Sequence, residues 1–490
     1  DHGLSEWQID TPEHLRWIDI DEATEQRLVE RDEDEHRREH SVLVVEDTPD
    51  VARVIRLALP LVLTQAGQMT VHLVDNAMIG RVGTTELAAA SFANSIYVVI
   101  MLFGIGVFMG VTPLVSRARG GRDDLAAAAL MKSSLAFSGL LIGAVTALAA
   151  AVALAMPLMG QTEAVVRLSL PYYGLLALST IPLLTFILLK QIGEGLGNTT
   201  AAMGATVIAN LVNVTGNYVL IFGKFGFPEL GLLGAGYATL LSRIVSPLLL
   251  VALFACVPSI RASFALMRRV RASFARFARV LSVGLPIAGQ MVLEVAAFSW
   301  SAVMMGWLGE VPLASHQIAM GLATFSFMIA NAVAMATTIR VSFTLGGADY
   351  GGLRRLAWSA VHVAGASMGC CALAFLLLRH DIPRLFTPDG RVIAQAASLL
   401  AIAALFQVFD GLQITCIGIL RGFADVRVPM LISGFSYMVI GLGMSWFLAF
   451  RLGFGPEGIW FGFLAGLAAA CALLVLRIRM QLRPGVPEPG

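Results

Sequence analysis

The sequence predicts an all-α integral membrane protein: twelve transmembrane helices form two six-helix bundles, related by a pseudo-two-fold axis along the membrane normal. Three observations support this fold class: an apolar composition, twelve long apolar segments, and a repeat that relates the two halves of the chain. Of the 490 residues, 57% are hydrophobic and 14% are charged, whereas soluble domains carry roughly 25% charged residues. A chain this apolar cannot cover its own surface in water, so lipid must be its solvent.

Acidic residues separate a tail from the membrane body. Of the 33 Asp and Glu residues, 17 lie in the first 50 positions, and we predict an acidic cytoplasmic tail at 1–50 that is disordered or partly helical. The net charge of +1 gives no reason to expect nucleic-acid binding. The five cysteines fall in or beside apolar stretches without metal-binding spacing, so we interpret them as packing residues.

Twelve segments are long enough to cross a bilayer, which requires about 20 mostly apolar residues. Their richness in Gly and Ala allows close approach of helices in lipid. The predicted spans are 54–79, 88–116, 127–156, 165–189, 201–222, 232–256, 280–307, 312–344, 356–379, 392–419, 428–450 and 457–477.

The basic residues at helix ends and in loops predict the orientation. If the tail is cytoplasmic, 20 Lys and Arg residues, including Lys190 and Arg421, lie on that side, and 6 lie outside. The positive-inside rule therefore places both termini in the cytoplasm, with the protein in the plasma membrane. The basic cytoplasmic linker 257–279 divides an N-terminal bundle, 51–256, from a C-terminal bundle, 280–483, which a short tail, 484–490, follows.

The two halves repeat each other at a nearly constant offset. Shared positions at a shift of 226 include Pro60 with Pro286, Gly83 with Gly309, and Gly120-Gly121-x-Asp123 with Gly346-Gly347-x-Asp349. At a shift of 225, Ile192, Gly193 and Gly197 fall on Ile417, Gly418 and Gly422. Because each half has an even number of helices, both insert in the same sense, and the substrate path is expected between them.

Three carboxyl groups lie inside predicted spans: Asp75, Glu294 and Asp410. The other acids of the membrane body, such as Glu194, fall in predicted loops or at helix ends. An acid at the bilayer centre costs about 2.5–3.5 kcal/mol and usually faces a cavity on an ion or substrate pathway. Burial also makes a carboxylate easier to protonate, which is the chemistry that a proton-coupled or sodium-coupled carrier requires.

Polar residues accompany these acids on the same helix faces. The spacing i, i+4, i+7 places Gln68, His72 and Asp75 on one helix face, and the spacing i, i+4, i+11 does the same for Gln290, Glu294 and Ser301. The shift of 226 places Glu294 at the position of Gln68, and Ser301 at that of Asp75. The candidate substrate cavity comprises Gln68, His72, Asn210, Asn213, Asn217, Gln290, Ser301 and Gln407. Gln413 is a further candidate neighbour of Asp410, whereas Lys132, Arg167 and Arg243 are expected near helix ends, with their charges reaching the interface.

Four stretches resemble motifs of the multidrug and toxin extrusion (MATE) transporters. "PLVLTQAGQMTVHLVDNAMIGRVGTTELAAAS" resembles their first helix, and "GEGLGNTTAAMGATVIANLVNVTGNYVLIFGKFG" their fourth to fifth helices. "GLPIAGQMVLEVAAFSWSAVMMGWLG" resembles the seventh helix, and "FQVFDGLQITCIGILRGFADVRVPM" the tenth. The resemblance covers roughly residues 54–480 and points to the NorM-like branch.

The resemblance implies roles for individual residues. In that branch the acids of helices seven and ten, here Glu294 and Asp410, bind and couple the cation, with Na⁺ as one candidate ion at this pair. The acid of helix one, here Asp75, is linked to protonation, and the paired asparagines of helix five match Asn213 and Asn217. The acidic N-terminal extension is not part of the family pattern.

The leading hypothesis is a cation-coupled (H⁺ or Na⁺) antiporter that exports cationic amphipathic drugs or toxic organic compounds by alternating access. The expected partners are small organic substrates and membrane lipid; we expect a monomer without cofactor, nucleic acid or ATPase subunit, since no GxxxxGK[ST] phosphate loop is present. An alternative is a flippase or exporter of a lipid-linked or anionic metabolite, which often lines its path with basic residues. An intramembrane enzyme is less consistent with a chain that lacks HExxH, and a passive channel does not explain three separated acids in a repeat.

Overall fold

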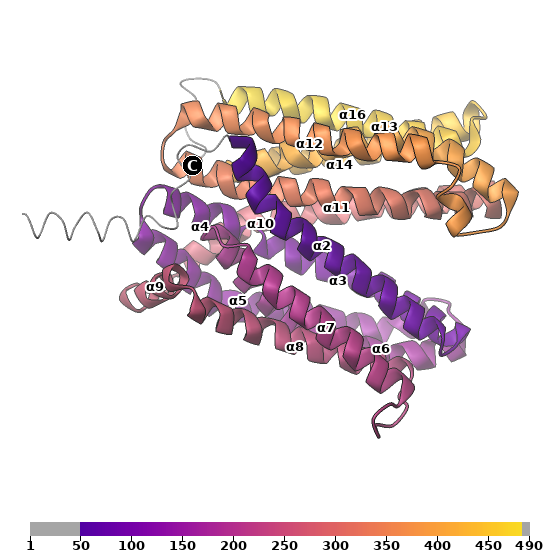
Figure 1. Ribbon diagram of the computed structural model, residues 1–490, viewed down its shortest axis with the longest axis horizontal. Helices are drawn as coiled ribbons and strands as arrows, with labels where there is room; N and C mark the ends of the chain where they lie inside the picture. The colour runs from indigo at the N-terminus through magenta and orange to yellow at the C-terminus, as the bar shows by residue number, and fades with distance from the viewer. Residues whose placement is uncertain (1–49, 483–490) are drawn as a thin grey trace, which may run out of the picture. The chain divides into compact units, whose positions relative to one another are not determined.

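The computed structural model describes residues 50–482, and these fold into twelve apolar helical spans joined by short turns (Figure 1). The prediction of an all-α membrane protein with twelve transmembrane helices is confirmed. The predicted acidic tail, 1–50, lies outside the described part of the chain except for Asp50, and the last eight residues, 483–490, also lie outside it.

Both halves are built from helices of similar order. The N-terminal half contains α2 (Asp50–Gly80), α3 (Thr84–Phe108), α4 (Val111–Gly120), α5 (Asp124–Ala155), α6 (Glu163–Gly195), α7 (Thr200–Phe222) and α8 (Leu232–Cys256). Helix α9 (Pro258–Leu266) occupies the predicted linker. The C-terminal half contains α10 (Phe274–Leu308), α11 (Glu310–Gly346), α12 (Tyr350–Leu378), α13 (Gly390–Gly422), α14 (Arg427–Gly434), α15 (Leu442–Trp446) and α16 (Gly455–Gln481). Short 3₁₀ turns lie at Met156–Leu158, Met267–Arg269 and Pro383–Leu385, and π-helical turns at Phe435–Gly441 and Phe447–Arg451.

Two of the twelve spans consist of several elements. Helices α3 and α4 form one span, Thr84–Gly120, with a turn at Met109 and Gly110 between them. Helices α14 and α15 and the two π-helical turns form another, Arg427–Arg451. π-Helical turns inside α-helices are frequent near functional sites, and Tyr437, in the first of them, belongs to the site described below.

The shared Gly-Gly-x-Asp motif folds into the same turn in both halves. The third residue of each motif has a left-handed backbone: Arg122 has φ 57° and Ala348 has φ 56°. The aspartate then caps the next helix, because Asp123 accepts the Ala126 N–H at 2.8 Å and Asp349 accepts the Gly352 N–H at 2.8 Å. The repeat at a shift of 226 therefore reflects common backbone geometry.

The expected alignment at a shift of 225 is wrong by two residues. Thr112 donates to the Gln191 carbonyl, and its repeat mate Thr338 donates to the Gly418 carbonyl, which relates the later helices by 227. The left-handed residues after these helices, Gly197 and Ala424, agree with that shift. Closely spaced glycines in both segments allow the sequences to be aligned at the wrong shift, whereas the equivalent hydrogen bonds establish the shift of 227.

The first helix of each half crosses into the other half. Val54, Ala58 and Leu61 of α2 pack in a core built from α11, α12, α13 and α16. The equivalent part of α10, from Val280 to Ile287, packs in the core of the N-terminal half. Figure 1 shows α2 running obliquely from the α12 side to the α7 side. The two bundles therefore interlock at one end.

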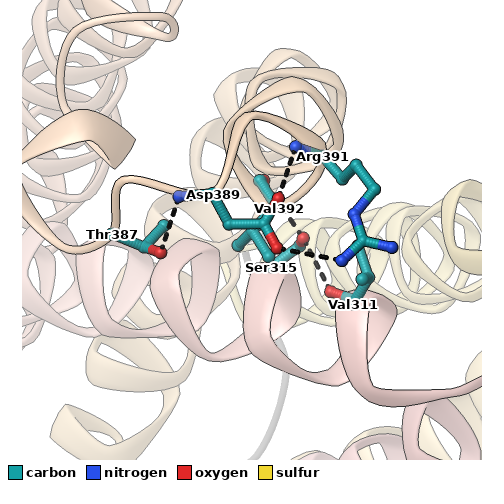
Figure 2. A network of polar contacts seen from close by, with 6 residues as sticks. All are labelled: Val311, Ser315, Thr387, Asp389, Arg391 and Val392. Carbon is teal, nitrogen blue, oxygen red and sulfur yellow. Dashed lines mark hydrogen bonds and ion pairs between the residues drawn. The ribbon is translucent and has the colours of Figure 1, made fainter.

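A polar network fixes the start of α13, the helix that carries Asp410 (Figure 2). Asp389 accepts the Arg391 N–H at 2.8 Å and the Arg391 side chain at 3.2 Å. Ser315 of α11 donates to the Val392 carbonyl of α13 at 3.2 Å. The beginning of α13 is thus both capped and tied to α11.

Candidate functional site

The two bundles meet where α4 lies against α11, at the ends of these helices. A Cβ atom added to Gly120 would lie 1.9 Å from the Phe343 carbonyl oxygen, and one added to Gly346 would lie 2.0 Å from that of Arg117. The shift of 226 places Gly120 on Gly346 and Arg117 on Phe343, so it converts one contact into the other. The pseudo-two-fold axis therefore passes between the two contacts. Ser116 adds a hydrogen bond across the interface, to the Ile339 carbonyl at 2.8 Å. This end of the molecule is closed by direct backbone packing.

In the N-terminal bundle, a chain of hydrogen bonds runs from α2 through α7 to α8. The Asn217 amide donates to Asp75 and also to Asn213 Oδ1 at 3.2 Å. Asn213 in turn donates to Thr239 of α8 at 3.5 Å. Because Asn213 and Asn217 are one turn apart on α7 and both buried, they hold the carboxyl group of Asp75 in place.

Arg243 lies beside this chain, one turn beyond Thr239 on the same face of α8. Its guanidinium donates to the Tyr97 hydroxyl at 2.8 Å and to Ser179 at 2.6 Å, and it lies 5.2 Å from the centroid of the Tyr97 ring. The expectation that Arg243 sits near a helix end is wrong, since it lies in the middle of α8 (Leu232–Cys256) and is partly buried. A charge at this depth costs about 2.5–3.5 kcal/mol and is therefore a sign of function.

The remaining candidates of the N-terminal bundle lie along α2 and α7. Asn210 packs against α2, where its amide nitrogen is 3.2 Å from a Cβ placed on Gly67, beside Gln68. His72 is exposed and lies close enough to Arg243 to interact electrostatically. The structure thus places these residues on the α2–α7 side that also carries Asp75.

In the C-terminal bundle, Glu294 of α10 faces a buried arginine. The Arg421 guanidinium, with the residue 5% exposed, donates to Gln290 Oε1 at 3.3 Å, one helical turn before Glu294. Glu294 and Arg421 also interact electrostatically. Sequence reasoning placed Arg421 on the cytoplasmic side with the loop residues, but it belongs to α13 and is covered by neighbouring helices.

Asp410 lies in the interior of the same bundle and is 5% exposed. It interacts electrostatically with Glu294, and both acids interact with Tyr437, whose hydroxyl donates to Gln413 at 2.8 Å. Among the described residues, Asp410 Oδ1 and Gln407 Oε1 are buried oxygens without a hydrogen-bond partner. Such oxygens suit either a proton or a hard cation such as Na⁺. Within residues 50–482, no three His, Cys, Asp or Glu side chains lie together in a way that could hold a metal ion.

Ser301 differs from the other candidates in its surroundings. It donates to the Phe298 carbonyl at 2.6 Å and lies 3.4 Å from His316 Nε2. His316 in turn packs edge-on against Trp460. The structure therefore joins Ser301 to a buried histidine and an aromatic core, and within residues 50–482 Ser301 makes no hydrogen bond to either acid.

Several polar residues of the interior escaped sequence reasoning. Lys190 and Glu194, expected in a loop or at a helix end, are buried in α6 at 3.7 Å from each other. At the shift of 227, the acidic Glu194 corresponds to the basic Arg421. Helix length could have revealed these residues. Helices α6 and α13 continue beyond their apolar segments, and Lys190, Glu194 and Arg421 lie on these polar helix ends.

Comparison with known proteins decides the family. The family model MatE matches residues 60–219 and 286–447, one match in each half. The chain belongs to the MATE family. It is 33% identical over 435 residues to a probable multidrug resistance protein NorM of Rhizobium meliloti (strain 1021), covering 87% of this chain and 92% of that protein. It is also 30% identical over 437 residues to the multidrug resistance protein MdtK of Edwardsiella ictaluri (strain 93-146), covering 88% and 96%.

Solved structures agree on the fold of this MATE protein. A crystal structure of MATE in the straight conformation superposes with a TM-score of 0.82, at 22% identity, over 89% of this chain and 96% of that one. The eukaryotic MATE transporter AtDTX14 superposes with a TM-score of 0.77, at 18% identity, over 88% and 96%. The protein is thus a multi-pass membrane transporter and not an enzyme.

Proposed function

We propose that this MATE protein is a cation-coupled antiporter that exports cationic amphipathic compounds, with H⁺ or Na⁺ as the coupling ion. The observation that carries the proposal is the pair of acids, Glu294 and Asp410, in the interior of the C-terminal bundle beside oxygens that lack partners. Asp75 supplies a third acid in the other bundle. Its relatives are named as multidrug resistance proteins, which supports small organic substrates.

Formal charges favour the C-terminal acids as the coupling site. With Glu294 and Asp410 ionised beside Arg421, this group carries a charge of −1 and gains from binding one monovalent cation. With Asp75 ionised beside Arg243, the N-terminal group is neutral. A coupling cation and an organic cation therefore compete for the same negative charge, and this competition produces exchange.

The bundle interface supports alternating access. The backbone packing of Gly120 and Gly346 closes the end formed by α4 and α11, and we propose that this end is cytoplasmic because its turns are rich in arginine. The state described here then faces outward, and both termini lie in the cytoplasm of a plasma-membrane protein. We further propose that the transporter acts as a monomer in contact with lipid.

The test is gradient-driven efflux of a fluorescent organic cation from proteoliposomes, with a proton gradient and a sodium gradient imposed in turn. Wild-type protein should transport with one of the two gradients. Asp410→Asn, which removes a 5%-exposed carboxylate without changing its size, should abolish gradient-driven efflux. Asp381→Asn is the matched control, because Asp381 is an exposed carboxylate of the same bundle, 3.0 Å from Arg384.

The possible outcomes separate the proposal from its rivals. Coupled transport that survives both Asp410→Asn and Glu294→Gln would contradict the assigned coupling site. Absence of transport of any organic cation by the wild-type protein would contradict the proposed substrate class. Loss of efflux in Asp381→Asn as well would show that the assay reports general damage.

The arginines inside the two bundles favour one second candidate, an exporter of anionic metabolites or a lipid-linked sugar. Arg243 and Arg421 place two guanidinium groups inside the bundles, more basic charge than the sequence led us to expect. Each faces an acid, so neither bundle presents uncompensated positive charge while its acids are ionised. Transport of an anionic probe, with no transport of organic cations, would favour this candidate.

A further inference from the structure

The position of Arg243 gives the N-terminal bundle a permanent positive charge close to a carboxyl group that can change its charge. The guanidinium is held in place by three contacts: Tyr97 at 2.8 Å, Ser179 at 2.6 Å, and the face of the Tyr97 ring at 5.2 Å. All of these partners are uncharged hydroxyl or aromatic groups. They fix the guanidinium without neutralising it.

The acid that interacts electrostatically with Arg243, Asp75, is held by a different partner. Asn217 donates to its carboxylate, and the chain continues through Asn213 to Thr239, one turn from Arg243 on α8. Asp75 and Arg243 interact electrostatically, yet within the described residues no ion pair of 4.0 Å or less joins them. The two charges are therefore neighbours that are held separately.

Few other ionisable groups face this pair from the surrounding helices. They are His72 on α2, Tyr97 on α3 and Tyr172 on α6, and α7 contributes the neutral asparagines. With Asp75 ionised and His72 neutral, the group has no net charge. With Asp75 protonated, it carries the full charge of Arg243.

We propose that Arg243 determines when organic cations can bind: its positive charge repels them from the space beside Asp75 whenever Asp75 is protonated. This inference rests on the proposed export of cationic compounds and assigns a specificity-determining residue to it. Protonation of Asp75 then changes the net charge of this group from zero to the full positive charge of Arg243. Two unit charges about 10 Å apart at an effective dielectric constant of about 20 change an affinity roughly tenfold.

The experiment measures equilibrium binding of tetraphenylphosphonium to purified protein at a fixed pH. This probe has a permanent charge, and Asp75→Asn imitates the protonated state while Asn217 can still donate to the new side chain. Asp75→Asn should weaken binding roughly tenfold. Asp75→Asn combined with Arg243→Gln should return the affinity to within about threefold of wild type, because the group is again neutral.

A lysine variant distinguishes charge from structure. Asp75→Asn combined with Arg243→Lys keeps the positive charge and should stay as weak as Asp75→Asn alone. No recovery with Arg243→Gln, equal recovery with both replacements, or no effect of Asp75→Asn would each overturn the inference. The control is Asp75→Asn combined with Arg167→Gln, which removes an exposed arginine from α6 of the same bundle and should not restore binding. Wild-type protein that does not bind the probe would overturn the proposed function as well.

Discussion

A methyl group at the bundle interface should shift the conformational equilibrium of the transporter. Gly120 has room for no side chain in the closed interface, because a Cβ atom there would lie 1.9 Å from the Phe343 carbonyl oxygen. Real Cβ atoms essentially never approach other heavy atoms within 3.0 Å, so α4 and α11 must separate by about 1 Å or more. Overpacking of this kind costs about 1–3 kcal/mol. Since the clash exists only in the closed state, Gly120→Ala should favour opening of this end about 5-fold to 150-fold.

The opening can be followed at Ser116, which is 1% exposed and bonds to Ile339 across the interface. In a variant that lacks the five native cysteines, Ser116→Cys should react slowly with a water-soluble maleimide. Adding Gly120→Ala should accelerate this reaction, and Gly346→Ala should do the same, because it meets the Arg117 carbonyl at 2.0 Å.

The matched control is Gly139→Ala in α5, where an added Cβ would meet nothing within 4 Å. It should leave the alkylation rate at Ser116→Cys unchanged. Equal rates with and without Gly120→Ala, in protein that remains folded, would refute the argument that this interface must part during the transport cycle. Equal acceleration by Gly139→Ala would show that the rate reports loosened helices and not the interface.

Two further predictions concern stability, measured as thermal unfolding in detergent. Hydrogen bonds from Arg391, its backbone N–H first, hold the pKa of Asp389 below its usual value. The resulting stabilisation is present above the unfolded-state pKa and is lost as pH falls through the folded-state pKa. Asp389→Ala should therefore lower Tm at neutral pH but not in strong acid. An equal loss of Tm at both pH values would contradict this prediction. Arg477→Met should cost about 1–3 kcal/mol, because Arg477 lies 2.7 Å from Asp425, whose side chain is 7% exposed. The exposed Arg479→Met on the same helix is the control, and an equal effect of both would contradict the assignment.

Most of the fold could be predicted from the sequence because the membrane constrains it strongly. A helix that crosses lipid must be long, apolar and hydrogen-bonded within itself, so length and composition suffice to find all twelve spans. The turns could also be predicted, since Gly-Gly-x-Asp carries its own capping residue. The interlocking of α2 with the other half could not, because an apolar helix face does not specify which apolar neighbour covers it.

The candidate site was predictable only in part, for a related reason. Asp75 and Asp410 stand out because a carboxyl group in an apolar segment is costly, whereas Arg421 follows the apolar stretch and resembles a loop residue. Its burial depends on the covering of the end of α13 by other helices, including α10 through Gln290. Arg243 was misplaced because a long side chain inside a span can be interpreted as reaching the interface; its bonds to Tyr97 and Ser179 exclude that interpretation.

The two halves keep the same interface but differ in the charged and polar groups of their interiors. The same close backbone contact occurs on both sides of the axis, at Gly120 and at Gly346. Asp75 corresponds to Ser301, which joins His316 instead of an asparagine pair. The two bundles therefore share the geometry of their interface, while the ionisable chemistry inside each bundle is separate.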